Sequence, residues 1–329
     1  SDKLNTNTYY FFLKHLFFIF LGIFILITFS AIDQKKLFNV SQYLFLIFFI
    51  FLALVPFIGV EVKGSIRWID LPVIPRFQPI EILKPFLIIM IATFFTLNNQ
   101  KHLYLKYLFS FLLIFPIVLF LISQPDLGQT ILIVLTWFSL IFVSGINLLF
   151  FFVFFTLTFS ILIYLIIYVP KFEYIKNRLI SFIDPNTGNN YQSERASEAI
   201  SNGGFFGQGI GEGTLNSKVP EAHTDYIISV ISEEFGVIIV LAIIIIFLVL
   251  FFNVLKKVNY ETDDKVKLIL VGAASIILFQ TFIHIGVNIR LLPTTGMTLP
   301  FLSYGGSSII STSIISGIIL NLTRRKVNK

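Results

Sequence analysis

The chain has 329 residues, of which 56% are hydrophobic and 13% are charged, and its mean hydropathy is +0.88. Soluble domains carry roughly a quarter charged residues because their surfaces face water, so this composition excludes an ordinary soluble protein. The absence of cysteine excludes disulfides, thiolate metal sites and cysteine nucleophiles. The net charge of +6 suits the basic cytoplasmic loops of a membrane protein, so we do not expect nucleic acid as a partner.

Apolar segments of a length that can cross a bilayer, about 20 residues each, follow one another along the whole chain. They occupy residues 9–31, 41–60, 80–97, 104–123, 127–146, 148–170, 226–254, 266–291 and 303–322. Within lipid the backbone must satisfy its own hydrogen bonds, so each segment should be a helix. The sequence therefore predicts an all-α integral membrane protein, a polytopic bundle of nine transmembrane helices forming a single domain over residues 1–329. Residues 171–225 should form one large loop within it.

The connections between these segments fall into two groups that differ in composition. Side A comprises the loops near 32–40, 98–103, 145–148 and 255–265 with the tail 323–329, and side B comprises the loops 61–79, 124–126, 171–225 and 292–302. Side A is short, basic and free of proline, so the positive-inside rule places it in the cytoplasm and side B in the periplasm. If proline and glycine merely collected in loops, both sides would contain them. Because side B holds nearly all of the proline and glycine residues found in the loops, we expect an outward-facing site there.

The N-terminus should lie on side B, because nine spans separate it from a cytoplasmic tail. The chain also begins with Ser1 and not with an initiator Met. From these two observations we expect a further transmembrane helix to precede Ser1.

The stretch His223-Thr224-Asp225 closes the large loop directly before an apolar segment. The pKa of a carboxyl group at a membrane boundary can be raised by desolvation or lowered by nearby cations and helix-terminal N–H groups, so Asp225 is tunable as a general base. The alternative is that Thr224 or Asp225 simply caps the helix, and the two roles are compatible.

Two further carboxylates, Glu233 and Glu234, follow inside the same segment, and Glu233 should lie ~12 Å along the helix axis from Asp225. Acidic residues within a span are costly and usually face a polar interior. A structural salt bridge to another helix and a direct role in the site both remain open for this pair.

Glu81 and Lys84 are spaced i,i+3 at the start of a predicted helix and could pair with each other. Lys84 could instead meet a phosphate as a compact cation, or extend its side chain to the membrane interface. Together with Lys63, Arg67 and Arg76, it makes side B cationic enough for an anionic lipid headgroup.

Two other patterns carry weaker signals. Gln280, His284 and Asn288 recur every four residues, which favours hydrogen bonding within the bundle over catalysis. The Gly-rich run 203–213 lacks the Lys-Ser/Thr ending of a nucleotide P-loop. It could approach an anion through its backbone amides, or it could be a plain mobile loop. No spacing of His, Asp and Glu resembles a protein-ligated zinc centre.

Taken together, motifs from about residue 10 to residue 323 resemble the SEDS family (shape, elongation, division and sporulation). They are Gly59-Val60-Glu61-Val62-Lys63-Gly64 with Arg67-Trp68, Gln78-Pro79-Ile80-Glu81 with Lys84, Gln124-Pro125-Asp126-Leu127-Gly128, Tyr191-Gln192, the Gly-rich run, His223-Thr224-Asp225, Glu233-Glu234, and Leu299-Pro300-Phe301-Leu302-Ser303-Tyr304-Gly305-Gly306-Ser307-Ser308. Ile80 departs from the family pattern, which usually has Ser there. Family members have ten helices, so the nine segments correspond to helices two to ten.

The resemblance implies a peptidoglycan glycosyltransferase of the inner membrane that polymerises lipid II into β-1,4 glycan during septal cell-wall synthesis. Asp225 would be the general base of an inverting reaction. The implied substrate-binding residues are Lys63, Arg67, Gln78, Glu81, Lys84, Gln124, Asp126, His223, Thr224 and Ser303. Expected partners are lipid II, a class B penicillin-binding protein and other divisome proteins. No cofactor is required, although a divalent cation could accompany the lipid diphosphate.

Two alternatives remain open. A lipid II flippase would also explain the many helices and the acidic pair Glu233-Glu234, but a transporter is expected to expose functional elements on both sides and to show internal repeats. No repeat is evident, and side A lacks motifs. An elongation-type member of the family is the second alternative. Ala222, Thr298 and Lys84-Pro85 favour the division type, whereas Arg76-Phe77-Gln78 favours the elongation type.

Overall fold

The computed structural model describes residues 10–62, 64–72, 75–97, 105–184 and 191–324. The apolar helices within them are α1 (Tyr10–Ala31), α2 (Gln34–Ile58), α3 (Pro79–Thr96), α4 (Leu105–Ser123), α5 (Leu127–Val143), α6 (Leu148–Tyr168), α9 (Ile227–Tyr260), α10 (Asp264–Asn288) and α11 (Gly306–Thr323). Eight of them are long and apolar enough to cross a membrane, and α5 is a shorter apolar helix of 17 residues. The predicted polytopic bundle is therefore confirmed in the described part of the chain.

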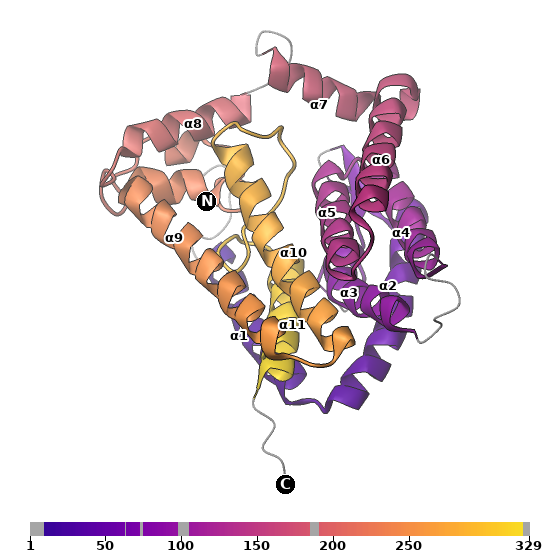
Figure 1. Cartoon of the computed structure of the whole chain (residues 1–329). Helices are drawn as coiled ribbons and strands as arrows, with labels where there is room; N and C mark the ends of the chain where they lie inside the picture. The colour runs from indigo at the N-terminus through magenta and orange to yellow at the C-terminus, as the bar shows by residue number, and fades with distance from the viewer. Residues whose placement is uncertain (1–9, 63, 73–74, 98–104, 185–190, 325–329) are drawn as a thin grey trace.

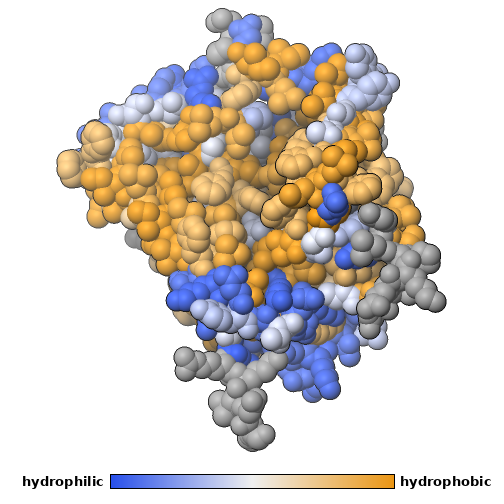
Figure 2. Space-filling view, in the orientation of Figure 1, coloured by the Kyte–Doolittle hydropathy of each residue, from blue (hydrophilic) through white to orange (hydrophobic). Residues whose placement is uncertain are grey.

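The helices of the bundle differ in how deeply they are buried. In their most apolar windows α3 is 78% buried and α10 is 83% buried, whereas α6 buries none of its window. Helix α10 packs against α3, α5 and α9, and α1 packs against α11 (Figure 1). On the face that Figure 2 shows, a broad hydrophobic band lies between hydrophilic surface toward the two ends. This distribution matches a protein that crosses a membrane several times.

On side A two helices begin earlier than their apolar segments predicted. Helix α2 begins at Gln34, where the Asp33 carboxylate accepts a hydrogen bond from the Lys35 amide at 3.2 Å. Helix α10 begins at Asp264, and the Asp263 carboxylate caps it in the same way. A capped first turn can be polar, so it lies outside any apolar run. The loop predicted at 32–40 is consequently only a short turn.

Side B contains structure that the sequence analysis assigned to loops. A hairpin of β1 (Val60–Val62) and β2 (Ser65–Trp68) follows α2, and with an isolated bridge between Ile69 and Phe77 it adds a little β structure to the predicted all-α fold. The large loop contains η2 (Pro170–Phe172), α7 (Glu173–Ile183), α8 (Tyr191–Gly203) and η3 (Asn216–Lys218). Helix α8 lies along the outer end of α9 (Figure 1).

The first part of the Gly-rich run packs tightly against α9. A Cβ atom on Gly203 would lie 1.9 Å from the Ser232 carbonyl oxygen, and one on Gly207 would lie 2.2 Å from that of Glu234. Helix α9 is interrupted at Gly236 (φ 81°), and the amides of the following turn donate to the carbonyl oxygens of the run. These glycines therefore allow close backbone contact, which neither of the two predicted roles for the run had included.

Candidate active site

A cavity of about 330 Å³ lies on side B, where the hairpin, the first turns of α3 and α5, α7 and the connection before α11 meet. Its lining includes six predicted site residues, namely Arg67, Gln78, Glu81, Asp126, Thr224 and Asp225. They come from four stretches that are far apart in the sequence, so the fold brings together motifs that the sequence could only place on the same side. We call this space the Asp225 cavity.

Asp225 is half-buried just before α9. Its Oδ2 atom is 3.6 Å from the point where a Cβ atom would stand on Gly296, whose φ of +69° favours glycine. The N-cap position of α9 falls on Tyr226, which makes no capping hydrogen bond. The Thr224 hydroxyl donates to the Glu221 carboxylate at 3.1 Å. The capping alternative is therefore wrong for Thr224, and the helix begins one residue too late for Asp225 to be its N-cap.

Three consecutive backbone carbonyls hold the His223–Asp225 turn in place. The donors are the Tyr304 amide to His223 O at 2.8 Å, the Ser303 hydroxyl to Thr224 O at 2.6 Å and the Asn288 side-chain amide to Asp225 O at 3.1 Å. They belong to the end of α10 and to the connection before α11. The backbone that carries the Asp225 carboxylate is thus fixed by segments more than 60 residues further along the chain.

Two arginines line the Asp225 cavity. The Arg67 Nε atom donates to Gln124 O at 2.9 Å, another of its nitrogens donates to Pro125 O, and Nη1 lies 3.7 Å from Asp126 Oδ1. Arg67 therefore holds the turn before α5 while 13% of its side chain stays exposed. All three contacts are to the Gln124-Pro125-Asp126 motif, which the sequence predicts on side B.

Arg178, on α7, is a candidate that sequence reasoning missed, because a single arginine in a polar loop has no informative spacing. Its Nη1 atom donates to Thr294 O at 3.0 Å. Burial lowers the pKa of Arg178, and nearby Arg67 adds to that, whereas Tyr174 and Asp126 raise it. Arginine still remains protonated, because its unperturbed pKa is so high. Burial, and then the neighbouring Asp225 carboxylate, raises the pKa of the Tyr226 hydroxyl.

Glu81 and Lys84 form the internal pair that their spacing allowed. The Lys84 Nζ atom is 2.8 Å from Glu81 Oε2 and donates to Gln280 Oε1 at 3.2 Å. The Lys84 side chain is 0% exposed, so the alternative in which it extends to the interface is wrong. Glu81 lines the Asp225 cavity, whereas Lys84 lies behind it and is not part of the lining.

The other predicted site residues that the structure describes lie within or beside this cavity. The Gln78 side-chain amide donates to Asp126 Oδ2 at 2.7 Å, and Asp126 caps α5. Gln124 and Ser303 are buried beside the cavity, and the ring of exposed His223 packs against Tyr304 at 5.6 Å. Lys63 lies outside the described residues.

Glu233 and Glu234 have structural contacts and do not line the cavity. Glu233 is fully buried, and its Oε1 atom accepts hydrogen bonds from Asn202 Nδ2 and the Leu215 amide, each at 2.9 Å. Glu234 accepts one from Asn216 Nδ2 at 3.2 Å. Within the described residues neither carboxylate forms a salt bridge, so the predicted pairing with another helix is not seen. The two acids instead fasten the large loop to α9.

The polar stripe of α10 forms the hydrogen bonds expected of it, but mainly with the chain on side B. Gln280 donates to Thr298 O at 2.9 Å, and His284 Nδ1 lies 2.7 Å from Met297 O. Asn288 contacts Asp225 as described above. No cluster of three or more His, Cys, Asp or Glu side chains suited to a metal ion occurs in the described ranges.

These features define a class: a multi-pass α-helical membrane protein with a charged cavity on the side of its large loop. The family model for the FtsW, RodA and SpoVE cell cycle proteins matches residues 1–328. The chain therefore belongs to the FtsW/RodA/SpoVE family, which confirms the resemblance inferred from the motifs.

Several relatives and solved structures are similar to the chain. Two relatives, each named a probable peptidoglycan glycosyltransferase FtsW, come from Caulobacter vibrioides (34% identity, covering 85% of this chain and 72% of the relative) and Coxiella burnetii (33%, covering 100% and 90%). A structure described as a peptidoglycan synthase complex that coordinates polymerization and crosslinking matches with a TM-score of 0.79 at 26% identity, covering 95% of this chain and 89% of the other. RodA of Thermus thermophilus matches with a TM-score of 0.70 at 25% identity, covering 96% and 88%.

Proposed function

We propose that this chain is a peptidoglycan glycosyltransferase that polymerises lipid II into β-1,4 glycan on the outer face of the inner membrane. One observation carries the proposal: the Asp225 carboxylate and the guanidinium groups of Arg67 and Arg178 line a single cavity on side B. The names of the relatives support the same reaction, and their division type supports a role at the septum.

The chemistry of the reaction suits these three side chains. The donor sugar is attached to a diphosphate, which is already a good leaving group, so cations rather than a carboxylic acid can stabilise its departure. The acceptor sugar hydroxyl needs one general base. Asp225 takes the hydroxyl proton as the oxygen attacks the anomeric carbon, and the diphosphate leaves with the electron pair of the broken C–O bond. Direct displacement converts an α linkage to a β linkage without an enzyme nucleophile.

The contacts of the other site residues suggest a separate role for each of them. Arg67 and Arg178 are positioned to meet the diphosphate, and Lys63 stays a third candidate for it. Lys84 takes a different role from the one expected, because its ammonium holds the Glu81 carboxylate at the wall of the cavity. Gln78, Glu81, Asp126 and Thr224 line the substrate space. The Gln124 carbonyl positions Arg67, and His223 and Ser303 position the Asp225 turn. A divalent cation can accompany the diphosphate without a dedicated protein site.

The proposed partners are a class B penicillin-binding protein, which crosslinks the glycan, and other divisome proteins. The similar peptidoglycan synthase complex supports the first of these. The basic loops of side A support a cytoplasmic placement for that side. A reporter fused after Lys329 should then report cytoplasm, and one inserted within 186–190 should report periplasm. Labelling of a cysteine near Lys257 from the periplasm would contradict this orientation.

The decisive assay uses the purified full-length protein with its penicillin-binding partner and lipid II, and glycan chains are resolved on a gel. We expect polymer from the wild type and almost none from Asp225→Asn. A protein that moves labelled lipid II between the leaflets of a vesicle and yields no polymer would support the flippase alternative. Polymer formation that is unaffected by Asp225→Asn would support the polymerase activity but reject Asp225 as its general base.

A further inference from the structure

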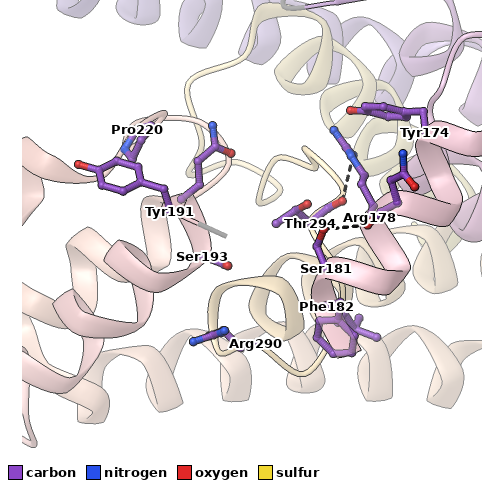
Figure 3. Close-up of a pocket in the computed structure, with 12 residues that line it drawn as sticks. Tyr174, Arg178, Ser181, Phe182, Tyr191, Ser193, Pro220, Arg290 and Thr294 are labelled. Carbon is purple, nitrogen blue, oxygen red and sulfur yellow. Dashed lines mark hydrogen bonds between the residues drawn. The ribbon is translucent and has the colours of Figure 1, made fainter. Parts of the chain in front are cut away.

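A second cavity, of about 390 Å³, adjoins the Asp225 cavity on side B (Figure 3). It lies between α7, α8 and the segment that follows α10, and we call it the outer pocket. Arg178, Gln192 and Thr294 line both spaces, and the hydrogen bond from Arg178 to Thr294 O lies at their boundary. A molecule whose reacting end occupied the Asp225 cavity could therefore extend into the outer pocket.

The outer pocket is cationic. In the part of the chain that the structure describes, its lining contains the guanidinium groups of Arg178 and Arg290 and no carboxylate. Among the described residues neither arginine forms an ion pair. Arg290 also lines a shallow groove with Glu194 and Glu198, but the ion pair there is between Glu198 and Arg195. The described lining thus holds two guanidiniums and lacks an acidic side chain, which favours an anionic ligand.

The backbone of Arg290 adds a second, independent observation. Its φ of 58° lies in the left-handed region, which glycine adopts freely and arginine does not. Residues held in such conformations cluster at active sites and ligand clamps. In Figure 3 the Arg290 side chain lies at the edge of the pocket below Ser193. The chain thus has a large charged side chain at a position where the backbone favours glycine.

The position of the pocket restricts which anion it can take. Its walls include α7 and α8, which are not among the helices able to cross a membrane. A lipid diphosphate must stay near the membrane surface, whereas the peptide arm of the precursor extends into water. Arginine also binds carboxylates through two parallel hydrogen bonds. The group that fits is a carboxylate on the part of the substrate farthest from its lipid.

We propose that the outer pocket binds, through Arg290, a peptide carboxylate of the saccharide whose reacting sugar occupies the Asp225 cavity. The proposal rests on the proposed function and specifies how the same site recognises its substrate. Arg290 lines the outer pocket and not the Asp225 cavity. A substitution at Arg290 therefore tests carboxylate binding without altering the residues that line the Asp225 cavity.

The test combines variants with two substrates: lipid II with free peptide carboxylates, and lipid II with those carboxylates amidated. Arg290→Gln should raise KM and Kd for the free-carboxylate lipid II about tenfold, the loss of one charged hydrogen-bonding partner. It should leave both constants unchanged for the amidated lipid II. Arg290→Gly should behave in the same way, and because glycine suits φ 58° it should fold at least as well as the wild type.

Arg76→Gln is the matched control, since Arg76 also lies on side B, pairs with Asp70 at 3.0 Å and lines neither cavity. It should change neither constant. Equal losses on both substrates, or no loss on either, would overturn the proposal. The Kd measurements judge the pocket even if the wild type makes no polymer, which would reject the proposed function alone.

Discussion

Two acidic residues eight positions apart behave differently in this molecule. Asp225 is half-buried, lines the cavity on side B and has Oδ2 near Gly296. Glu233 is fully buried, and its Oε1 atom accepts hydrogen bonds from Asn202 and Leu215. Asp225 is a candidate from the sequence because it lies at a membrane boundary, and Glu233 because acidic residues within a span usually face a polar interior. The difference teaches that the role of such a carboxylate depends on whether its oxygens face substrate space or the hydrogen-bond donors of a packed loop.

The largest expected effect separates the two acids by their chemistry. Asp225→Asn preserves the size of the side chain and removes its basicity, so polymerisation should fall roughly a hundred- to ten-thousand-fold. Thermal unfolding in detergent should stay close to that of the wild type. The measurement is the initial rate of glycan formation from lipid II. A rate close to that of the wild type would mean that Asp225, like Glu233, has a structural role and is not the general base.

Glu81 extends the comparison to a carboxylate that both lines the cavity and has a buried partner. Lys84→Met leaves Glu81 without its ammonium partner and should destabilise the fold by about 3–5 kcal/mol, the usual cost of breaking a buried pair. Adding Glu81→Gln removes the uncompensated charge and should recover most of that stability. Unfolding of the single and double variants in detergent measures both. If the double variant were no more stable than Lys84→Met, the buried pair would not explain the loss.

The contact between α9 and the Gly-rich run tests the structural side of the comparison. Gly207→Ala would place a Cβ atom 2.2 Å from the Glu234 carbonyl oxygen. The backbone must shift, so destabilisation should reach the upper end of the roughly 1–3 kcal/mol that overpacking costs. Gly211→Ala is the control, because Gly211 has the same φ of +78° and its Cβ atom would meet nothing within 4 Å. Equal shifts in Tm for the two variants would mean that backbone strain, and not the clash, causes the loss.

The smallest effect distinguishes Glu233 from its neighbour. Glu233→Gln weakens two hydrogen bonds that a buried charge accepts, and it should destabilise the fold by about 1.5 kcal/mol. Glu234→Gln alters one longer contact of 3.2 Å on a partly exposed residue and should change stability by less than about 0.5 kcal/mol. Thermal unfolding of both variants gives the comparison. Greater sensitivity at Glu234 would reverse our assignment of the loop anchor.

Much of the fold could be predicted because the length of an apolar run alone indicates a membrane span. The helix starts at Gln34 and Asp264 could not, since polar first turns depend on local caps and not on hydropathy. Helices α7 and α8 were missed for a related reason. Neither is long and apolar enough to cross a membrane, and both lie in a polar segment whose composition resembles that of a loop.

The site was predictable to the extent that its residues lie in motifs. Arg67 and Asp225 were placed on one side from the sequence, and the structure brings them to one cavity. The burial of Lys84 depends on α10 lying beside α3, a long-range contact that spacing within one helix cannot reveal. Arg178 reaches the cavity only because α7 folds back over it. Long-range packing therefore decided the outcomes that local patterns left open.

The interruption of α9 at Gly236 has a consequence for how the length of this chain can vary among related proteins. The Val237 and Ile238 amides donate to the carbonyl oxygens of Gly204 and Phe205 at 3.0 and 3.4 Å. In the opposite direction, the Gln208 and Gly209 amides donate to carbonyl oxygens of α9. One residue inserted between 204 and 208 would break the register between these two sets of hydrogen bonds. Insertions and deletions should therefore be excluded from this stretch and fall instead around Gly211, where the surroundings are open.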